Sequence, residues 1–202
     1  MPRTTPTPHP RRQTDETLIE SALRLAPRAR FLSADQRGRT AADRPLPIGH
    51  GQTSSQPRTV VEMLRLLDVS PGMRVLDVGA GSGWTTTLLA HLVGPTGSVL
   101  GLELVPELAA WGAGNLTSAD VPWARLEPAY PERLGRASAA PFDRILVSAE
   151  TRHLPGELVE QLVGAGLMVI PVAGRMLRVT RTSPAAEPQV ERLGHYRFVP
   201  LR

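Results

Sequence analysis

Length, composition and charge already narrow the class of protein. The chain has 202 residues, of which 41% are hydrophobic and 21% charged, and it contains no cysteine. This length suits one globular domain, and the absence of cysteine excludes a disulfide framework, a thiolate zinc site and a thiol nucleophile. The formal net charge is +4 and all 23 basic residues are arginine. Because these arginines are scattered and only 4% of the residues are aromatic, the charge does not predict a nucleic-acid-binding surface.

The amino-terminal segment differs from the rest of the chain. Residues 1–14 contain four prolines and no large apolar residue beyond Met1, so we predict a disordered tail followed by one domain over residues 15–202. The tail lacks the apolar core of a signal peptide. No apolar run in the chain reaches the roughly 18–20 residues that span a bilayer. We therefore expect a cytoplasmic protein.

Two helices are predicted on either side of a long connection. Apolar residues recur at helical spacing from Asp15 to Leu25, before Pro27, and again over residues 60–67. Residues 32–57 lie between them and show little periodicity. A connection of this length inside a compact domain is usually functional or disordered, and its run LPIGHGQTSSQP is too particular for a linker.

From residue 73 onward, predicted strands alternate with predicted helices. The strands cover residues 73–78, 98–103, 123–127, 144–148 and 167–172, and the helices cover 84–93, 106–116 and 155–163. Residues 176–181 and 194–199 are expected to form an antiparallel edge. This alternation predicts an α/β fold, a doubly wound and mostly parallel Rossmann-like sheet with additional N-terminal helices.

The sharpest motif is VLDVGAGSGW at residues 75–84, where a buried strand enters a glycine-rich turn and then a helix. Gly79 permits the sharp turn, and the bare backbone at Gly81 lets a ligand approach without a Cβ in the way. Glu103 ends the next strand, twenty residues after Gly83. An acidic side chain at that place can accept hydrogen bonds from the two hydroxyls of an adenosine ribose.

The same motif discriminates among nucleotide-like ligands. Position 84 is Trp where a dinucleotide fingerprint needs glycine, and the chain has no lysine for a phosphate-binding loop. The form Asp77-x-Gly79-x-Gly81-x-Gly83 suits S-adenosyl-L-methionine, which has no pyrophosphate. Its α-amino group can be received by an acidic residue near the turn. The motif therefore predicts this cofactor and leaves the reaction open.

Further motifs follow one another in order along the chain: RPLPIGHGQTSSQP at 44–57, APFDRILVSA at 140–149, EQL at 160–162, VIPV at 169–172 and FVPL at 198–201. Together with the glycine loop they resemble the protein-L-isoaspartate O-methyltransferases over nearly everything after the tail. The resemblance implies a class I methyltransferase that uses S-adenosyl-L-methionine to methylate the side-chain carboxylate of L-isoaspartyl residues in damaged proteins or peptides. We expect a monomer that acts on such proteins or peptides, with no nucleic-acid, membrane or metal partner.

The resemblance also assigns roles to individual residues. The active-site serine of the family falls on Ser55, which would orient the substrate carboxylate by a hydrogen bond. The implied cofactor contacts are Gln52, Thr53, Ser54, Asp77, Gly79, Gly81, Gly83, Glu103, Leu104 and Glu127. The implied substrate contacts are Pro47, Ile48, His50 and Ser55. Because the carboxylate is already anionic at neutral pH and the sulfonium methyl is already activated, the chemistry needs alignment and exclusion of water rather than a strong base.

Some positions depart from the family pattern. Ala41 stands where a tyrosine is usual, and Ser54 replaces an apolar residue. The sequence LEPAY at 126–130 replaces a Gly-Asp-Gly whose aspartate contacts adenine, which leaves Glu127 as the candidate substitute. The charged residues Glu150, Arg152 and His153 replace a small apolar stretch.

These departures leave two alternatives open. One is a specialised aspartyl or isoaspartyl methyltransferase that modifies one dedicated peptide in natural-product maturation, with the charged residues at 150–153 reading its sequence. The other is a cofactor-binding module without turnover. A methyltransferase of RNA or of a small molecule is disfavoured by the run LPIGHGQTSSQP.

Overall fold

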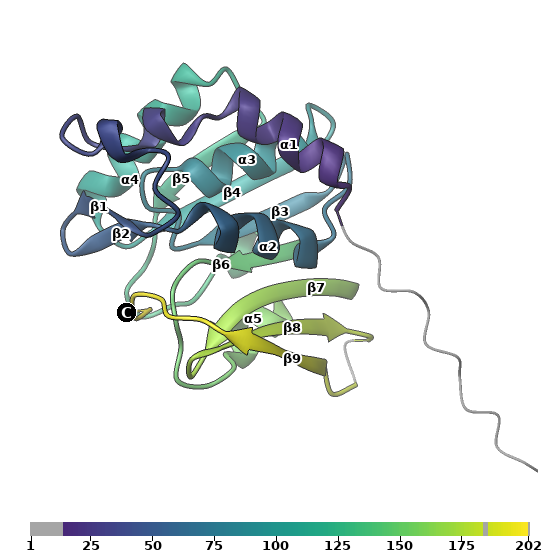
Figure 1. The fold of residues 1–202 in the computed structure, drawn as a ribbon. Coiled ribbons are helices and arrows are strands. Elements are labelled where there is room, and N and C mark those ends of the chain that lie inside the picture. Colours follow the sequence, from purple (N-terminus) through teal and green to yellow (C-terminus); the bar gives the residue numbers. More distant parts are fainter. Residues whose placement is uncertain (1–13, 184–185, 202) are drawn as a thin grey trace, which may run out of the picture.

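The described part of the chain is built on one seven-stranded sheet (Figure 1). The computed structural model describes residues 14–183 and 186–201. The sheet order is β5-β4-β3-β6-β7-β8-β9; the first five strands run parallel, and β8 and β9 add an antiparallel edge. The strands are β3 (Arg74–Val78), β4 (Ser98–Glu103), β5 (Ala124–Pro128), β6 (Phe142–Val147), β7 (Leu162–Val172), β8 (Arg175–Arg181) and β9 (Gln189–His195). The predicted doubly wound α/β fold is confirmed.

Helices cover the two faces of this sheet unequally (Figure 1). The helices are α1 (Glu16–Leu25), α2 (Pro57–Leu67), α3 (Trp84–Val93), α4 (Pro106–Ser118) and α5 (Gly156–Glu160). The first four contribute side chains to one apolar core, and α5 contributes to a second core on the opposite face. Successive residues of β3 enter opposite cores, with Val75 in the first and Leu76 in the second. The strand is therefore buried on both faces, which is why its sequence is a nearly continuous apolar run.

The two halves of the sheet diverge between β3 and β6. From β3 the chain proceeds outward through β4 to β5, then returns to β6 on the other side of β3 and continues to β7. Ligands of doubly wound sheets bind in the crevice beyond the carboxyl ends of the strands at such a point. Gly79 follows β3 and Ser148 follows β6, so both residues lie at this edge.

The long connection contains a hairpin that its aperiodic sequence does not indicate. β1 (Leu46–Gly49) and β2 (Gln52–Ser54) pair antiparallel, and the three residues 49–51 at the turn all have positive φ. Strands of three or four residues are too short to show a clear alternation of apolar and polar side chains, so the pattern alone does not reveal them. The hairpin carries the LPIGHGQTS run as a defined structure.

Two predicted boundaries near the carboxyl end are wrong. The helix expected over residues 155–163 ends at Glu160, and β7 already begins at Leu162. The Gly164-Ala165-Gly166 stretch admits a positive φ at Ala165 and an irregular register against β6, so the strand continues through it. The edge strand expected over residues 194–199 lies earlier, at Gln189–His195. Beyond it, the chain turns toward the carboxyl edge of the sheet, where Val199 lines a pocket.

Thr14, the last residue of the predicted disordered tail, is ordered. Thr14 is buried; its hydroxyl donates to the Leu64 carbonyl at 2.6 Å and accepts from the Val69 amide at 2.8 Å. The remaining tail residues, 1–13, lie outside the described residues. In residues 14–183 and 186–201, no helix has both the length and the apolar character required to cross a membrane.

Candidate active site

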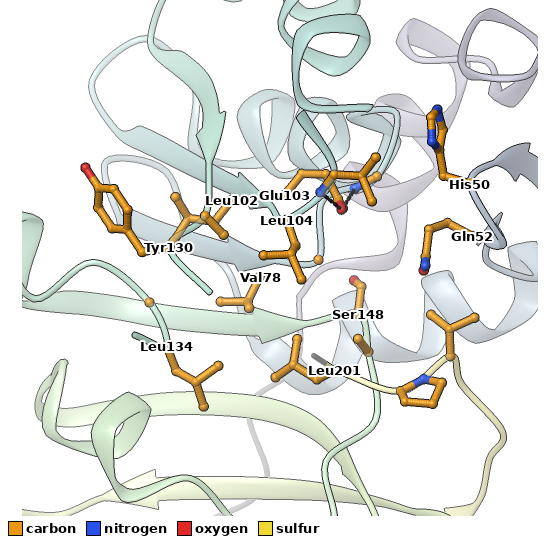
Figure 2. A pocket seen from close by; sticks show the side chains of 18 of the residues that line it. His50, Gln52, Val78, Leu102, Glu103, Leu104, Tyr130, Leu134, Ser148 and Leu201 are labelled. Carbon is orange, nitrogen blue, oxygen red and sulfur yellow. Dashed lines mark hydrogen bonds between the residues drawn. The ribbon is translucent and has the colours of Figure 1, made fainter. Parts of the chain in front are cut away.

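The main pocket lies beyond the carboxyl ends of β3, β4 and β6, where the fold predicts a ligand site. The glycine turn, the β1–β2 hairpin, the segment after β5 and the carboxyl-terminal residues 199–201 all contribute to its lining. In Figure 2, Tyr130 and His50 lie at opposite ends of the pocket, with Glu103 between them. One elongated pocket therefore spans the predicted cofactor loop and the hairpin.

Glu103 is the central polar group of the main pocket. Its side chain is buried, with Oε2 accepting a hydrogen bond from the Gly81 amide at 2.8 Å and Oε1 accepting one from the Val105 amide at 3.0 Å (Figure 2). A carboxylate offers about four acceptor positions, so about two remain for a ligand. The two backbone contacts fix the orientation of the carboxylate, as its predicted ribose-binding role requires.

The three glycines of the turn have different structural roles. Gly79 and Gly81 line the pocket with φ of +79° and +55°, and such values are strained for residues with a Cβ. A Cβ on Gly81 would also lie 3.0 Å from Ile48 Cδ1 of the hairpin. Gly83 instead packs against α4, where a Cβ would lie 2.9 Å from Leu116 Cδ1, and it lines none of the described pockets. Its placement does not support the expected cofactor contact.

Asp77 lies beneath the turn and is fully buried. Its Oδ2 accepts hydrogen bonds from the Thr85 and Thr86 hydroxyls, both at 2.7 Å, and Oδ1 has no partner among the described residues. Burial raises the pKa of Asp77 to about 6. Asp77 lines none of the described pockets, so its visible role is to hold the start of α3, and its contact with a cofactor stays a prediction.

The far end of the main pocket differs from what the sequence indicates. Glu127, the expected adenine contact, forms ion pairs with Arg125 at 2.8 Å and Arg136 at 3.0 Å and lies outside the described pockets. Its charge is already engaged, so its placement does not support an adenine contact. Tyr130 lines this end instead, with the Arg136 guanidinium 4.6 Å from its ring centre. Its side chain is 57% exposed.

A second pocket lies beside the first, between the start of α2 and residues 195–199. Ser55, Arg58 and Glu62 line it from the α2 side. A small connecting pocket joins the glycine turn to Ser54 and Ser55. Two residues, Thr53 and Ser148, line all three pockets. The predicted cofactor side and the predicted substrate side therefore meet at these two residues.

The other predicted residues divide into three groups. Ile48, His50, Gln52, Thr53 and Leu104 line the main pocket, as their expected roles require. Ser54 is buried and lines only the connecting pocket. Pro47 is exposed and lines none of the described pockets, because successive residues of a strand point to opposite faces.

Arg28 is a buried residue beside the site that the sequence does not point to. Its side chain is buried and donates hydrogen bonds to the carbonyls of Ser54 at 3.0 Å and Ser55 at 2.9 Å. It also donates to the Ser54 hydroxyl at 3.2 Å. Further bonds reach the carbonyls of Ala42 and Arg44, at 3.1 and 2.9 Å. One guanidinium thus holds the backbone on both sides of the hairpin, and nothing in the sequence distinguishes it from the other arginines.

The charged residues at 150–153 do not join the site. Glu150 pairs through its backbone with the carboxyl-terminal segment, donating to the Val199 carbonyl and accepting from the Leu201 amide. Glu150, Arg152 and His153 line none of the described pockets. Their placement gives no support to a dedicated peptide reader. Among the described residues, no cluster of three or more His, Asp or Glu side chains forms a metal-binding group.

Comparison with known proteins gives consistent findings. The sequence model of the Protein-L-isoaspartate(D-aspartate) O-methyltransferase (PCMT) family matches residues 10–202. The chain is 41% identical over 191 residues to a protein-L-isoaspartate O-methyltransferase of Aeropyrum pernix, covering 93% of this chain and 73% of that protein. It is 44% identical over 195 residues to one of Anaeromyxobacter dehalogenans, covering 93% and 90%.

The fold also resembles a solved structure from Plasmodium falciparum. That protein is assigned as a protein-L-isoaspartate O-methyltransferase, and its crystal structure contains S-adenosyl-L-homocysteine. The two chains superpose with a TM-score of 0.80 at 24% identity, covering 93% of this chain and 91% of the other. At this identity the likeness concerns the fold.

Proposed function

The chain belongs to the protein-L-isoaspartate(D-aspartate) O-methyltransferase family, and from this premise we propose that it methylates the side-chain carboxylate of L-isoaspartyl residues in proteins and peptides. The methyl donor is S-adenosyl-L-methionine, and the enzyme acts in protein repair. The observation that carries the proposal is the junction of the pockets. Thr53 and Ser148 line both the main pocket and the pocket that Ser55 lines.

The residues of the main pocket fit the cofactor. Glu103 keeps free acceptor positions for the ribose hydroxyls, and Gly79 and Gly81 present bare backbone to the methionine part. When bound, S-adenosyl-L-methionine supplies a methyl group that its sulfonium already activates, so the attacking carboxylate needs no general base.

We propose that Tyr130 replaces the missing adenine contact. It lines both the main pocket and a neighbouring pocket, whereas Arg136 lines only the neighbouring one. Arg136 therefore backs the ring from outside the main pocket. The guanidinium is held by the Pro128 carbonyl at 2.9 Å and by Glu127 at 3.0 Å. A base stacks favourably on an aromatic ring without specific hydrogen bonds.

On the acceptor side, the chain supplies alignment and shielding. Ser55 lines both the second and the connecting pocket, which supports a role for its hydroxyl as a donor to the acceptor carboxylate. Arg28 fixes the carbonyls of Ser54 and Ser55 and thereby the position of that hydroxyl. Residues 199–201 line the main pocket and help to exclude water from it. Holding the reactants in one geometry supplies most of the rate enhancement that such a transfer needs.

The direct test is methyl transfer from labelled S-adenosyl-L-methionine to paired peptides that differ only in an Asp or isoAsp linkage, in several sequence contexts. We expect labelling of the isoAsp peptides whatever the flanking residues. Labelling that needs normal Asp or one particular sequence would instead identify a dedicated peptide-modifying enzyme. Absence of labelling together with intact cofactor binding would identify a binding module without turnover.

Two substitutions separate the two sides of the site. Ser55→Ala should lower kcat/KM by about 10-fold or more while the Kd for S-adenosyl-L-homocysteine stays the same. Glu103→Ala should weaken binding of S-adenosyl-L-homocysteine by about 100-fold, since it removes bonds between a carboxylate and two hydroxyls. Equal losses of both properties in the Ser55 variant would remove that residue from the substrate side.

We further propose a monomeric cytoplasmic enzyme that uses no nucleic-acid or membrane partner. The absence of a nucleic-acid partner is supported by the arginines, which are scattered along the chain rather than clustered. Light scattering at several concentrations tests the oligomeric state, and a mass that rises with concentration would contradict it.

A further inference from the structure

Ser148 stands directly after β6, at the point where the two halves of the sheet diverge. Its Oγ is shielded from solvent and has no hydrogen-bond partner in the part of the chain that the structure describes. In Figure 2 the hydroxyl points up into the space between Glu103 and Gln52. A shielded hydroxyl without a partner is costly to keep, so a group that arrives with a ligand is the natural partner.

The position of Ser148 indicates which part of a bound ligand lies beside it. The main pocket holds Glu103 and the glycine turn, whereas the second pocket holds Ser55 and the start of α2. Ser148 lines both of them and the connecting pocket as well. Methyl transfer requires donor and acceptor to meet, so the transfer takes place beside Ser148.

We propose that Ser148 is a second hydroxyl that binds the methyl-accepting carboxylate, in addition to Ser55. This inference rests on the proposed function and deepens it by assigning the two oxygens of the carboxylate. Ser148 donates to the oxygen that is not methylated and so fixes the rotation of the carboxylate. The other oxygen is left free to attack. Ser55 approaches the same group from the hairpin side.

The assignment follows from charge and geometry together. The carboxylate is the one anionic group that the acceptor must bring to the junction, and a neutral hydroxyl donates well to an anion. Of the two residues that line all three pockets, Thr53 belongs to the paired hairpin strand, whereas Ser148 follows the end of a central strand. A group on a central strand is held more rigidly than one on a short hairpin, so it is suited to set an orientation.

The test is a double-mutant cycle between Ser148→Ala and the substrate carboxylate. The ligands are an isoAsp peptide and the same peptide with β-alanine, which keeps the backbone of the isoAsp residue but lacks the carboxylate. Their Kd values are measured by calorimetry on wild type and variant, each saturated with S-adenosyl-L-homocysteine. We expect Ser148→Ala to raise the Kd for the isoAsp peptide by about 10-fold. The Kd for the β-alanine peptide should stay within about twofold of the wild-type value.

The controls use matched hydroxyls. Ser148→Thr keeps the donor and should retain affinity within about threefold. Thr151 lies three residues further on, also carries a shielded hydroxyl without a described partner, and lines none of the described pockets. Thr151→Val should leave the isoAsp affinity unchanged. Equal losses for Thr151→Val and Ser148→Ala would overturn the proposal, because they would show a general effect on the segment.

Two other results overturn the assignment. If Ser148→Ala weakens both peptides equally, the hydroxyl does not bind the carboxylate. If it weakens S-adenosyl-L-homocysteine by the same factor as the isoAsp peptide, the hydroxyl serves the cofactor. Failure of the proposed function is recognised separately, because wild-type protein would then not methylate isoAsp peptides. The binding cycle uses no turnover and still decides the role of Ser148 in that case.

Discussion

The two ends of the main pocket are built in different ways. Beside the hairpin end, the Ser54–Ser55 run is held by a buried guanidinium that bonds to its backbone carbonyls, and Ser54, which lines the adjoining connecting pocket, is only 6% exposed. At the far end, Tyr130 is 57% exposed and is backed by Arg136, which in turn pairs with Glu127. The hairpin end matches the family pattern closely, and the far end departs from it.

The two ends differ because the two binding tasks place different demands on the protein. Placement of the acceptor oxygen requires a fixed backbone, because small displacements of reacting groups lower rates steeply. Adenine binding requires a flat apolar surface and some polar contact, which several side-chain arrangements supply. In the proposed site, the end assigned to the acceptor is therefore buried and held by its backbone, whereas the end assigned to adenine relies on an exposed side chain.

The largest effect is expected at Arg28. Arg28→Ala leaves the carbonyls of Ser54, Ser55, Ala42 and Arg44 without their donor. We expect kcat/KM to fall by about 100-fold or more and the free energy of unfolding to fall by about 3 kcal/mol. Steady-state kinetics and urea unfolding measure these two quantities.

A matched control and a graded variant accompany this prediction. Arg30 lies in the same short helical turn, is exposed, and should tolerate alanine with a change within about 0.5 kcal/mol. Arg28→Lys keeps the charge but loses the planar fork, so its kcat/KM should lie between those of wild type and Arg28→Ala. Wild-type kcat/KM in a folded Arg28→Ala protein would contradict the role of the clamp.

The buried carboxyl of Asp77, beneath the glycine turn, is tested through the pH dependence of stability. Its folded-state pKa of about 6 lies above the ordinary 3.8, so the folded protein binds more protons than the unfolded chain between these pH values. The contribution of Asp77 to the free energy of unfolding is present below pH 3.8 and is lost as the pH rises through 6. In Asp77→Asn this loss should disappear. The free energy of unfolding of the variant relative to wild type should therefore rise by about 3 kcal/mol between pH 3.5 and 7.5.

Urea unfolding without cofactor, at several pH values, measures this difference. Glu132→Gln provides the control, because Glu132 is exposed and lies outside the turn. A constant difference between Asp77→Asn and wild type across this range would show that the Asp77 carboxyl titrates alike in the folded and unfolded chains.

The exposed end is tested at Tyr130. Tyr130→Ala should weaken binding of S-adenosyl-L-homocysteine by about 10-fold, since it removes one aromatic stacking surface. Tyr130→Phe keeps the ring and should bind within about twofold of wild type. Calorimetry gives both Kd values. An unaltered Kd for Tyr130→Ala would show that adenine binds elsewhere in the pocket.

The smallest effect on stability and activity is expected at Ser54. This residue lies beside the hairpin end and departs from the family pattern. Ser54→Ala removes one of the acceptors of Arg28, at 3.2 Å, but leaves its carbonyl bonds in place. We expect a loss of about 1 kcal/mol in the free energy of unfolding and less than a threefold fall in kcat/KM. A loss as large as that of Arg28→Ala would show that the hydroxyl, rather than the backbone, holds the loop.

Local sequence patterns are sufficient to predict the fold class and the position of the glycine loop. Strand β3, the turn at Gly79 and helix α3 follow one another without interruption, so local periodicity and glycine positions specify them. The position of Glu103 beside the glycine loop could be predicted because parallel strands bring their carboxyl ends to one edge of the sheet. The run around Ser55 was recognised by its family resemblance rather than by its periodicity, and its hairpin was not foreseen.

Which side chains meet at this edge of the sheet depends on tertiary packing. Arg28 reaches Ser54 over 26 positions, and Ser148 lies beside a loop that is nearly a hundred residues away in the chain. Glu127 was expected in the pocket and pairs instead with Arg125 and Arg136. Local spacing sets which end of a strand a side chain occupies, but the partner of a charged or hydroxyl group depends on packing between distant segments, which no short pattern encodes.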